Sequence, residues 1–258
     1  MAYRSILYEQ REGIGVITLN RPEKRNALSL ELLREFASCM EEVGSGRSAK
    51  VVIVKGAGEH FCAGHDLNEI LKGELSDVRR LFEVCLDLMM ILQEAPQPVI
   101  AQVRGVATAA GCQLVAACDL AVAEEGARFA TPGVQIGLFC STPMVPLYRA
   151  VGRKKALEML FTGDFVGAGQ AREWGLVNRV VPLDALEQET LGLAEQIARY
   201  SSLTLGIGKR AFYRQVNMAD RDAYEYAKEV ISANAVMDDA IEGISAFLEK
   251  RSPVWKDA

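Results

Sequence analysis

The sequence is poor in the residues that build metal centres. Its 258 residues include two histidines, and no pair of its six cysteines is separated by two residues. Structural zinc sites need Cys and His ligands at close spacing, so we expect no metal site. Cysteines scattered through a chain of this length are also unlike a disulfide scaffold. We expect each cysteine to be a small buried side chain that packs like a hydrophobic residue, and we expect a reducing, cytoplasmic location.

A long apolar run and an excess of basic residues are also missing. A membrane span needs about 20 nearly continuous apolar residues, but the longest apolar stretch, Val99–Ala123, is interrupted by Arg104, Gly111, Gln113 and Asp119. The N-terminal stretch "MAYRSILYEQREGIGVITL" has no basic region followed by an apolar one, so we expect no signal peptide. The formal net charge of −5 at pH 7 argues against a nucleic-acid partner, which requires a basic face. We therefore expect neither a membrane nor a nucleic acid as partner.

The N-terminal half alternates between strand and helix patterns. Two strand-like runs flank Glu12–Gly13 and predict a hairpin. Ser29 is a suitable cap for a helix that ends near Gly44. Further strands are predicted in "KVVIVKG", "PVIAQVRG" and "DLAVA", with helices over Leu75–Gln93 and Ala109–Ala117 between them. This alternation is typical of an α/β fold with right-handed crossovers.

The C-terminal half is predominantly helical. Helices are predicted in "KKALEMLF" and "GQAREWG", a strand in "LVNRVVP", and three helical stretches between Asp184 and Lys250. No linker rich in Ser, Pro or Gly separates the two halves. We expect an α/β core over residues 1–195 and a helical region over residues 196–258 that packs on the core or on a neighbouring subunit.

Two glycine turns lie where helices are expected to begin. One is Cys62-Ala63-Gly64-His65-Asp66-Leu67, and the other is Thr108-Ala109-Ala110-Gly111-Cys112-Gln113. Free N–H groups at such turns carry partial positive charge. Two that converge on one point form an oxyanion hole. The alternative is two ordinary tight turns of the kind that α/β folds contain in number.

Five stretches of the chain carry a resemblance to a known family. They are "RPEKRNALS", "FCAGHDL", "AAGCQLVAACDLAVA", "ARFATPGVQIGL" and "GLVNRVVP". Their order and spacing resemble the crotonase family, also called the enoyl-CoA hydratase/isomerase family, over nearly the whole chain. Within that family, "GHDL", "AAGCQL" and "GLFCSTP" resemble one subgroup in particular.

The resemblance implies a crotonase-like spiral of βαβ-type turns and a C-terminal helical trimerisation region. It implies acyl-CoA thioesters as ligands, with coenzyme A as part of the substrate and no permanently bound cofactor. It also implies self-association as a homotrimer or a dimer of trimers. The family's oxyanion donors correspond to the backbone N–H groups of His65 and Ala110, which agrees with the glycine turns.

The resemblance fails at the residues that catalyse hydration. Hydratases of the family place catalytic glutamates at the positions of Gln113 and Gly133. A glutamine amide orients water but takes up no proton, and glycine offers only backbone. Because each positioned acid or base contributes about 10²–10⁴-fold, we expect slow or absent hydration of simple enoyl-CoAs. Restoring both carboxylates in a Gln113→Glu, Gly133→Glu variant is expected to create hydratase activity if the pocket is intact.

Other side chains near these turns offer alternatives. The ring of His65 titrates near neutral pH in ordinary surroundings and is a candidate acid or base, unless only its backbone matters. Asp66 either braces its loop or takes part directly. Cys140 and Ser141 are candidate nucleophiles that would need an activating base. Thr142 is a suitable helix cap before Pro143.

The resemblance also implies where coenzyme A is bound. Lys24 and Arg25, followed by Ala27 and Leu28, resemble the loop that meets the CoA phosphates and adenine. The turn residues Ala63, Asp66 and Leu67 are predicted to contribute to the same site. Phe247 and Lys250 match positions that approach the CoA of a neighbouring subunit, although core packing is an equal alternative for Phe247.

Three functions agree with these observations. The first is a hydratase/isomerase-family enzyme that stabilises a thioester enolate without the usual glutamates. The second is a decarboxylase of 2-carboxyacyl-CoAs such as methylmalonyl-CoA, because loss of CO₂ forms the enolate directly. The "GHD" loop resembles that of family decarboxylases. The third is a non-catalytic acyl-CoA binder or regulatory oligomer that kept only the fold.

Overall fold

A parallel sheet forms the centre of the molecule. The computed structural model describes residues 3–46 and 49–257. Its strands are β1 (Ile6–Arg11), β2 (Ile14–Leu19), β3 (Val51–Gly56), β4 (Val99–Val103), β5 (Val106–Thr108), β6 (Leu120–Glu124), β7 (Arg128–Ala130), β8 (Val166–Gly167) and β9 (Arg179–Val181). One sheet has the order β1-β2-β3-β4-β6-β9, and a smaller one has the order β5-β7-β8. In the larger sheet only the β1–β2 hairpin is antiparallel.

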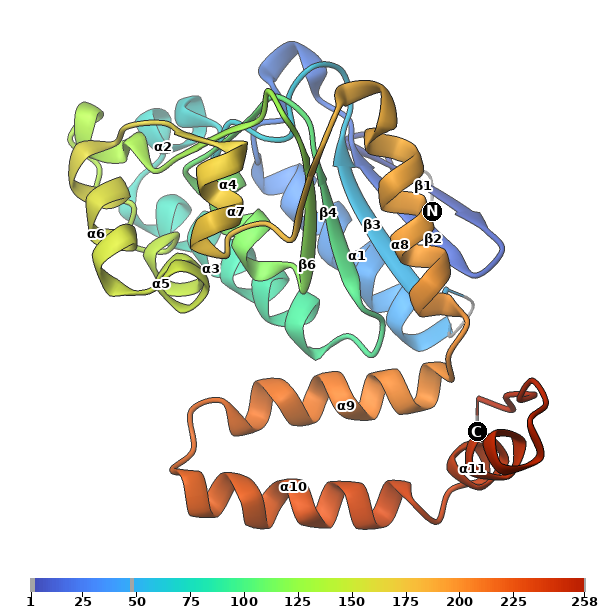
Figure 1. Cartoon of the computed structure of the whole chain (residues 1–258). Helices are drawn as coiled ribbons and strands as arrows, with labels where there is room; N and C mark the ends of the chain where they lie inside the picture. The colour runs from blue at the N-terminus through green and yellow to red at the C-terminus, as the bar shows by residue number, and fades with distance from the viewer. Residues whose placement is uncertain (1–2, 47–48, 258) are drawn as a thin grey trace.

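Helices cover both faces of the larger sheet. The α-helices are α1 (Leu30–Gly46), α2 (Leu67–Lys72), α3 (Leu75–Glu94), α4 (Ala110–Ala117), α5 (Met144–Val151), α6 (Arg153–Thr162), α7 (Ala168–Trp174), α8 (Leu186–Ala198), α9 (Ser202–Gln215), α10 (Asp220–Asn234) and α11 (Asp238–Glu249). Short 3₁₀ helices are η1 (Pro22–Lys24), η2 (Pro132–Ile136) and η3 (Leu183–Ala185). Figure 1 shows α8 on one face of the sheet and α1 and α3 on the other.

The two faces explain why the first four residues of β3 are all apolar. In β3, Val51 and Ile53 belong to the small cluster under α8, whereas Val52 and Val54 belong to the large core with α1 and α3. Side chains alternate between faces along a strand, so a strand covered on both sides needs apolar residues at every position. The run "VVIV" therefore encodes burial on both faces.

The chain winds as a spiral whose turns add strands to both sheets. β4 in the larger sheet is followed by β5 in the smaller one, and β6 is followed in the same way by β7. The segment that follows β3 forms no strand of its own and makes isolated β-bridges, between Cys62 and Ala107 and between Leu28 and His65. The expected crotonase-like α/β spiral with a helical C-terminal region is confirmed. Because of these bridges, residue 28 and the segments 62–65 and 107–110 lie side by side.

A buried ion pair attaches the C-terminal helices to the core. Lys209 of α9 donates to the Asp119 carboxylate at 2.6 Å and to the carbonyl oxygens of Leu92 and Gln97 at 2.7 and 2.8 Å. Tyr213, one turn further on, donates to the other oxygen of Asp119 at 2.8 Å. Burial lowers the pKa of Lys209, and the charge of Asp119 opposes that shift. This network fixes α9 beneath the sheet (Figure 1).

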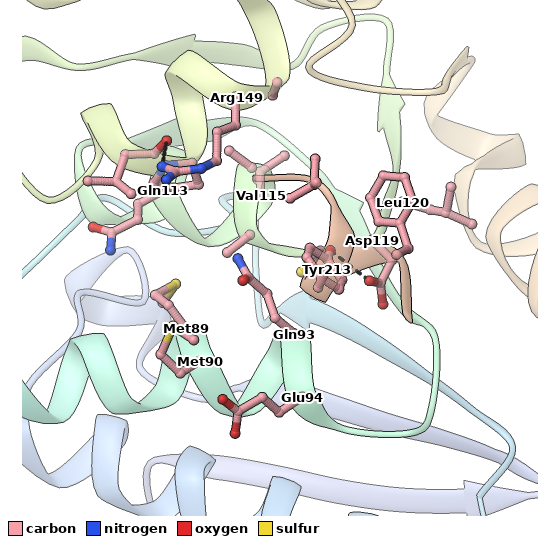
Figure 2. Close-up of a pocket in the computed structure, with 18 of the residues that line it drawn as sticks. Met89, Met90, Gln93, Glu94, Gln113, Val115, Asp119, Leu120, Arg149 and Tyr213 are labelled. Carbon is pink, nitrogen blue, oxygen red and sulfur yellow. Dashed lines mark hydrogen bonds between the residues drawn. The ribbon is translucent and has the colours of Figure 1, made fainter. Parts of the chain in front are cut away.

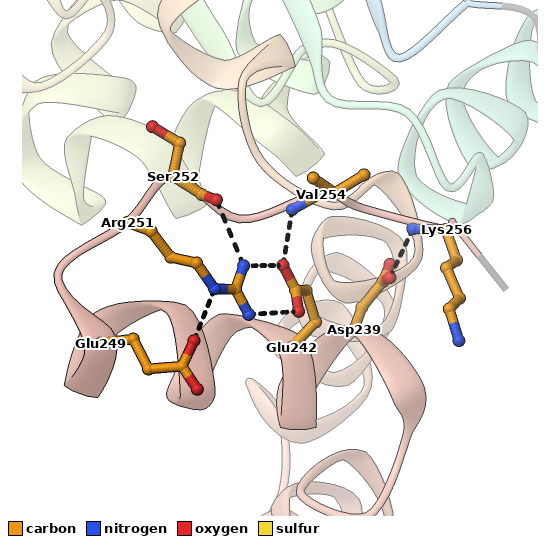
Figure 3. Close-up of polar contacts among 7 residues, drawn as sticks. All are labelled: Asp239, Glu242, Glu249, Arg251, Ser252, Val254 and Lys256. Carbon is orange, nitrogen blue, oxygen red and sulfur yellow. Dashed lines mark hydrogen bonds and ion pairs between the residues drawn. The ribbon is translucent and has the colours of Figure 1, made fainter.

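A second polar network folds the C-terminal tail back on α11. Arg251 forms a two-bond ion pair with Glu242 at 2.6 and 2.9 Å, as Figure 3 shows. Asp239, which is buried, accepts from Ser201 Oγ and from the N–H groups of Lys256 and Asp257. The tail therefore ties the start of α11 to the start of α9.

Several expectations need correction. Four helices, α8 to α11, occupy the stretch predicted to hold three. Pro143, not Thr142, occupies the cap position of α5, and no side chain caps that helix. Residue 195, the predicted boundary, lies inside α8, which packs on the sheet and continues to Ala198. Ser29 does cap α1, because its Oγ accepts the Leu32 N–H at 3.2 Å. None of the helices in the described ranges has the length and apolarity to cross a membrane.

We predict that the Lys209→Met variant is less stable than the wild type by about 3–5 kcal/mol, because it leaves Asp119 charged and partly buried without its cation. Chemical denaturation monitored by circular dichroism measures the change. A Lys209→Met, Asp119→Asn double variant should recover part of the loss. Lys228→Met, which removes an exposed pair with Glu225, is the matched control and should change nothing. Equal stability of Lys209→Met and the control would contradict the anchoring role.

Candidate active site

Two parallel bridges bring the glycine turns together. The Leu28 N–H donates to the Gly64 carbonyl at 2.7 Å, and the Asp66 N–H donates to the Leu28 carbonyl at 3.0 Å. In such a bridge the N–H of the intervening residue, His65, points away from the partner strand. Cys62 is bridged in the same way to Ala107, through bonds with Val106 and Thr108. The backbone around His65 is therefore fixed on both sides.

Two residues with positive φ lie in the two glycine turns, each just before a residue whose N–H has no partner in the described part of the chain. Gly64 has φ +99, and Ala109 has φ +48, a conformation that costs a residue with a Cβ about 1–3 kcal/mol. A Cβ added to Gly64 would stand 2.9 Å from the Ala109 Cβ and 3.5 Å from the Ala110 nitrogen. Only glycine therefore allows the two turns to approach so closely.

The amides of His65 and Ala110 have no hydrogen-bond partner among residues 3–46 and 49–257. Ala110 is the first residue of α4, where a helix leaves its N–H groups without intrahelical acceptors. These N–H groups come from the adjoining segments. The arrangement supplies two fixed donors for an incoming oxygen.

The ring of His65 is kept neutral by its surroundings. Burial lowers its pKa to about 4, and the Leu28 backbone opposes the shift only in part. Both ring nitrogens are buried without a well-formed hydrogen bond in the described structure, and the ring packs edge-on against Phe82 of α3 at 5.0 Å. A histidine with this pKa is a neutral imidazole at neutral pH, with one ring N–H, and not an imidazolium that could serve as a general acid. His65 contributes its backbone N–H and a neutral ring.

Asp66 braces the loop instead of facing the turn. Its carboxylate pairs with Arg21 at 2.9 Å and accepts the Asn68 N–H at 3.1 Å, which caps α2. Burial raises the pKa of this carboxyl, but the hydrogen bonds and charge of Arg21 and Asn68 outweigh it and hold the pKa below its ordinary value. Its oxygens are already engaged. The bracing alternative for Asp66 is therefore the one that the geometry supports.

The predicted CoA loop is built around Asn26. This buried side chain accepts the Arg21 N–H and donates to the carbonyls of Ala57 and His60. Lys24 and Arg25 are exposed beside it. The Ala63 N–H donates to the Arg25 carbonyl at 3.0 Å, so the loop is attached to the first glycine turn. Ala27 is half-buried, Leu28 is buried, and Leu67 is exposed at the start of α2.

Gln113 lies one turn into α4 from Ala110. Its side chain is 4% exposed, and its Oε1 has no partner within the described part of the chain. It lines a crevice of about 1220 Å³ between α3, α4, α5, α9 and α10, as Figure 2 shows. His65 and Ala110 are outside this lining, whereas Gln113, three residues after Ala110 on α4, belongs to it.

Gly133 cannot be replaced by a larger residue without moving its neighbours. A Cβ there would overlap the Leu138 carbonyl oxygen and stand 2.9 Å from the Sγ of Cys140. The loop after η2 occupies the space that a glutamate at residue 133 would need. A gain of hydratase activity in the Gln113→Glu, Gly133→Glu variant would therefore require this loop to move.

Neither candidate nucleophile is activated. Burial raises the pKa of the Cys140 thiol, and the Gly133 backbone opposes this only in part. The Ser141 hydroxyl donates to the Phe139 carbonyl at 3.3 Å and is exposed. No imidazole or carboxylate is bonded to either side chain among the described residues, so the geometry gives no support to covalent chemistry here.

Phe247 and Lys250 lie far from the glycine turns of their own chain. Phe247 is 82% exposed on α11, and Lys250 ends that helix with φ +57. Figure 1 shows α11 beyond α9, remote from α2 and α4. The core-packing alternative for Phe247 is therefore wrong for the single chain.

Two residues that contact the first glycine turn were not predicted from the sequence. Arg21 pairs with Asp66 across 45 positions, and Phe82 contacts His65 from α3. Arg21 opens the stretch "RPEKRNALS", but nothing local indicates its distant partner. Phe82 lies on the apolar face of a predicted helix, where it looks like an ordinary core residue.

The spiral, with two free amides on its adjoining turns, defines a crotonase-like α/β protein. The family model described as enoyl-CoA hydratase/isomerase matches residues 9–258. A mouse relative, "Enoyl-CoA hydratase domain-containing protein 3, mitochondrial", is 45% identical over 247 residues, 95% of this chain and 82% of its own. The chain belongs to the enoyl-CoA hydratase/isomerase family.

Solved structures agree with this assignment. The crystal structure of human enoyl coenzyme A hydratase domain-containing protein 3 has a TM-score of 0.95 and 45% identity, over 98% of this chain and 100% of its own. An enoyl-CoA hydratase from Mycobacterium smegmatis has a TM-score of 0.95 and 45% identity, over 98% of this chain and 99% of its own. The predicted family is confirmed, as is the predicted likeness to the subgroup represented by protein 3.

We predict that His65 does not titrate between pH 8 and pH 5. The chain has two histidines, so a His65→Phe variant assigns the ring signals in a proton NMR titration. Because the folded pKa lies below the ordinary 6.5, the unfolded chain takes up this proton first as pH falls. The free energy of unfolding then decreases from about pH 6.5 toward pH 4. In this range the pH dependence of the unfolding free energy reports how many more protons the unfolded state binds, and His65→Phe should reduce that number by up to about one. A His65 signal with a pKa near 6.5 would contradict the neutral ring.

Proposed function

We propose that this chain binds acyl-CoA thioesters with the thioester oxygen between the backbone N–H groups of His65 and Ala110. The observation that carries the proposal is that these two N–H groups lack partners among the residues that the structure describes, on turns that approach each other at Gly64 and Ala109. Such donors stabilise the negative charge that develops on the oxygen of a thioester enolate. Each is worth about 10²–10³-fold in rate.

Hydration of simple enoyl-CoAs is expected to be slow or absent. Gln113 takes up no proton, and Gly133 has no side chain. The nearby carboxylates are engaged elsewhere, Asp66 with Arg21 and Glu69 with the Leu30 N–H. The chemistry that remains is stabilisation of an enolate by neutral groups.

A neutral interior favours decarboxylation of a 2-carboxyacyl-CoA as a second candidate. In that reaction the bond to the carboxylate carbon breaks, CO₂ leaves, and the electron pair forms the enolate that the two amides stabilise. A proton from solvent then completes the product. Neutral His65 and Gln113 contribute no positive side-chain charge that would stabilise the ground-state carboxylate, which supports this candidate.

We also propose that the chain works as a homotrimer or a dimer of trimers. Helix α10 buries none of its residues, and α11 exposes Ile241, Ile244, Phe247 and Leu248. Apolar faces of this kind favour covering by another subunit. A neighbour's Phe247 and Lys250 would then approach the loop containing Lys24 and Arg25, as expected for a shared CoA site.

A reducing compartment such as the cytoplasm is the location that we propose. All six cysteines are free and buried, which fits an environment where disulfides do not form. The mouse relative is named as mitochondrial, and that name applies to the mouse protein.

We predict that an enolate mimic binds tightly. A CoA thioether with an ionised nitroalkyl group should bind about 100-fold more tightly than its uncharged alkyl counterpart, because anionic oxygens gain most from the two amides. Gly64→Ala should separate the turns and reduce this preference at least tenfold. Gly169→Ala, where a Cβ meets open space, is the control. Equal affinities for the two ligands in the wild-type protein, measured by calorimetry, would contradict the proposal.

We predict that crotonyl-CoA hydration by the wild type stays near background and that Gln113→Glu raises it at least tenfold, because one positioned carboxylate then serves as acid and base. Gln113→Met is the matched control. Assays of 3-enoyl isomerisation, methylmalonyl-CoA and ethylmalonyl-CoA decarboxylation and thioester hydrolysis complete the comparison. Turnover in any of them excludes a pure binder. Rapid hydration by the wild type would contradict the assignment of Gln113.

A further inference from the structure

An apolar stripe on α3 leads from His65 to the crevice. Leu75, Val78, Phe82, Leu86 and Met90 follow one another at intervals of three or four residues, which places them along one side of the helix. Phe82 contacts His65, while Leu86 and Met90 line the crevice. Phe82 and Met90 are about 12 Å apart along the helix axis. The stripe thus offers an apolar path away from the two free amides.

The opposite wall of this path comes from α4 and α5. Gln113 of α4 lines the crevice, as do Val145 and Pro146 of α5. Leu86 and Met90 are partly exposed although they are apolar. An apolar chain laid between these walls would remove that surface from water.

Cations without counter-ions line the crevice. Arg149, Arg210 and Arg214 belong to its lining, and none of them has a carboxylate partner within residues 3–46 and 49–257. The lining carboxylates are Glu94 and Asp119, of which Asp119 is already engaged by Lys209. The crevice therefore carries an excess of positive charge, in a chain whose total charge is −5.

Arg149 is the arginine best placed for an acyl chain. One of its terminal nitrogens donates to the Val145 carbonyl at 3.0 Å, so the side chain lies along α5 over the crevice (Figure 2). Its remaining N–H groups are free in the described structure. A planar guanidinium held in this way favours a carboxylate, to which it donates two parallel hydrogen bonds.

We propose that the crevice selects acyl-CoA thioesters whose acyl chain ends in a carboxylate, and that Arg149 binds that carboxylate. The inference rests on the proposed binding of the thioester at His65 and Ala110. It adds the substrate class: monothioesters of dicarboxylic acids. The acyl chain lies along the α3 stripe, past Gln113, and its far end pairs with Arg149. Uncharged methyl-ended chains of the same length gain the apolar contacts but not the ion pair.

Calorimetry with matched saturated ligands tests this selection. The ligands are hexanoyl-, octanoyl- and decanoyl-CoA and the mono-CoA thioesters of hexanedioic, octanedioic and decanedioic acids. For at least one length, the carboxylate-ended ligand should bind the wild type at least tenfold more tightly. Arg149→Gln should abolish this preference and leave affinity for the methyl-ended ligand within about twofold. Arg153→Gln, which alters an exposed arginine outside the crevice, should keep the preference.

Three outcomes would overturn the selection. They are equal binding of both ligand types at every length, a preference that survives Arg149→Gln, and a preference lost equally in Arg153→Gln. If a second copy of the chain fills the crevice, the preference is absent and Arg149→Gln changes the sedimentation coefficient. Failure of every acyl-CoA to bind would instead refute the proposed function, so the two failures are distinguishable.

Discussion

The close approach of two turns is the constraint on which the site depends. A glycine at residue 64 lets the turn after β3 come within contact of the turn before α4, and a strained alanine at residue 109 precedes Ala110, the first residue of that helix, whose N–H has no partner in the described part of the chain. The bridges of Leu28 and Cys62 fix both segments from the outside. Each feature is modest alone. Together they place two donors on adjoining turns without any charged side chain.

The interior around these donors is kept uncharged. Burial lowers the pKa of His65 and raises those of Cys62, Cys112 and Cys140, so the neutral form of each is favoured. Asp66 is charged but directed to Arg21. In surroundings of low polarity, fixed dipoles act more strongly on a developing charge than they do in water. The absence of glutamates at residues 113 and 133 is consistent with this pattern.

Local sequence signals predicted the elements of the fold well. The apolar strands, the hairpin at Glu12–Gly13 and the Ser29 cap depend on residues close in sequence, so their patterns are visible without a structure. The motif resemblance predicted the spiral, whereas the two glycine turns were predicted from their own residues. Thr142 was misassigned because Pro143 takes the cap position itself.

Those local signals could not predict contacts between residues that lie far apart in sequence. The pairs Arg21–Asp66 and Lys209–Asp119 join residues that lie far apart in sequence, and nothing local indicates either partner. The obstruction at Gly133 arises from Leu138 and Cys140, whose loop follows no periodic pattern. Arg149 is one exposed arginine among many in the sequence, and only the shape of the crevice distinguishes it.

Infrared difference spectroscopy tests the central claim most directly. A saturated acyl-CoA labelled with ¹³C at the thioester carbonyl reports how strongly that bond is polarised when it is bound. Two amide donors at the oxygen predict a clear shift of the carbonyl stretch to lower frequency relative to the free ligand. A bound carbonyl that absorbs at the frequency of the free thioester would show that the oxygen does not lie between His65 and Ala110.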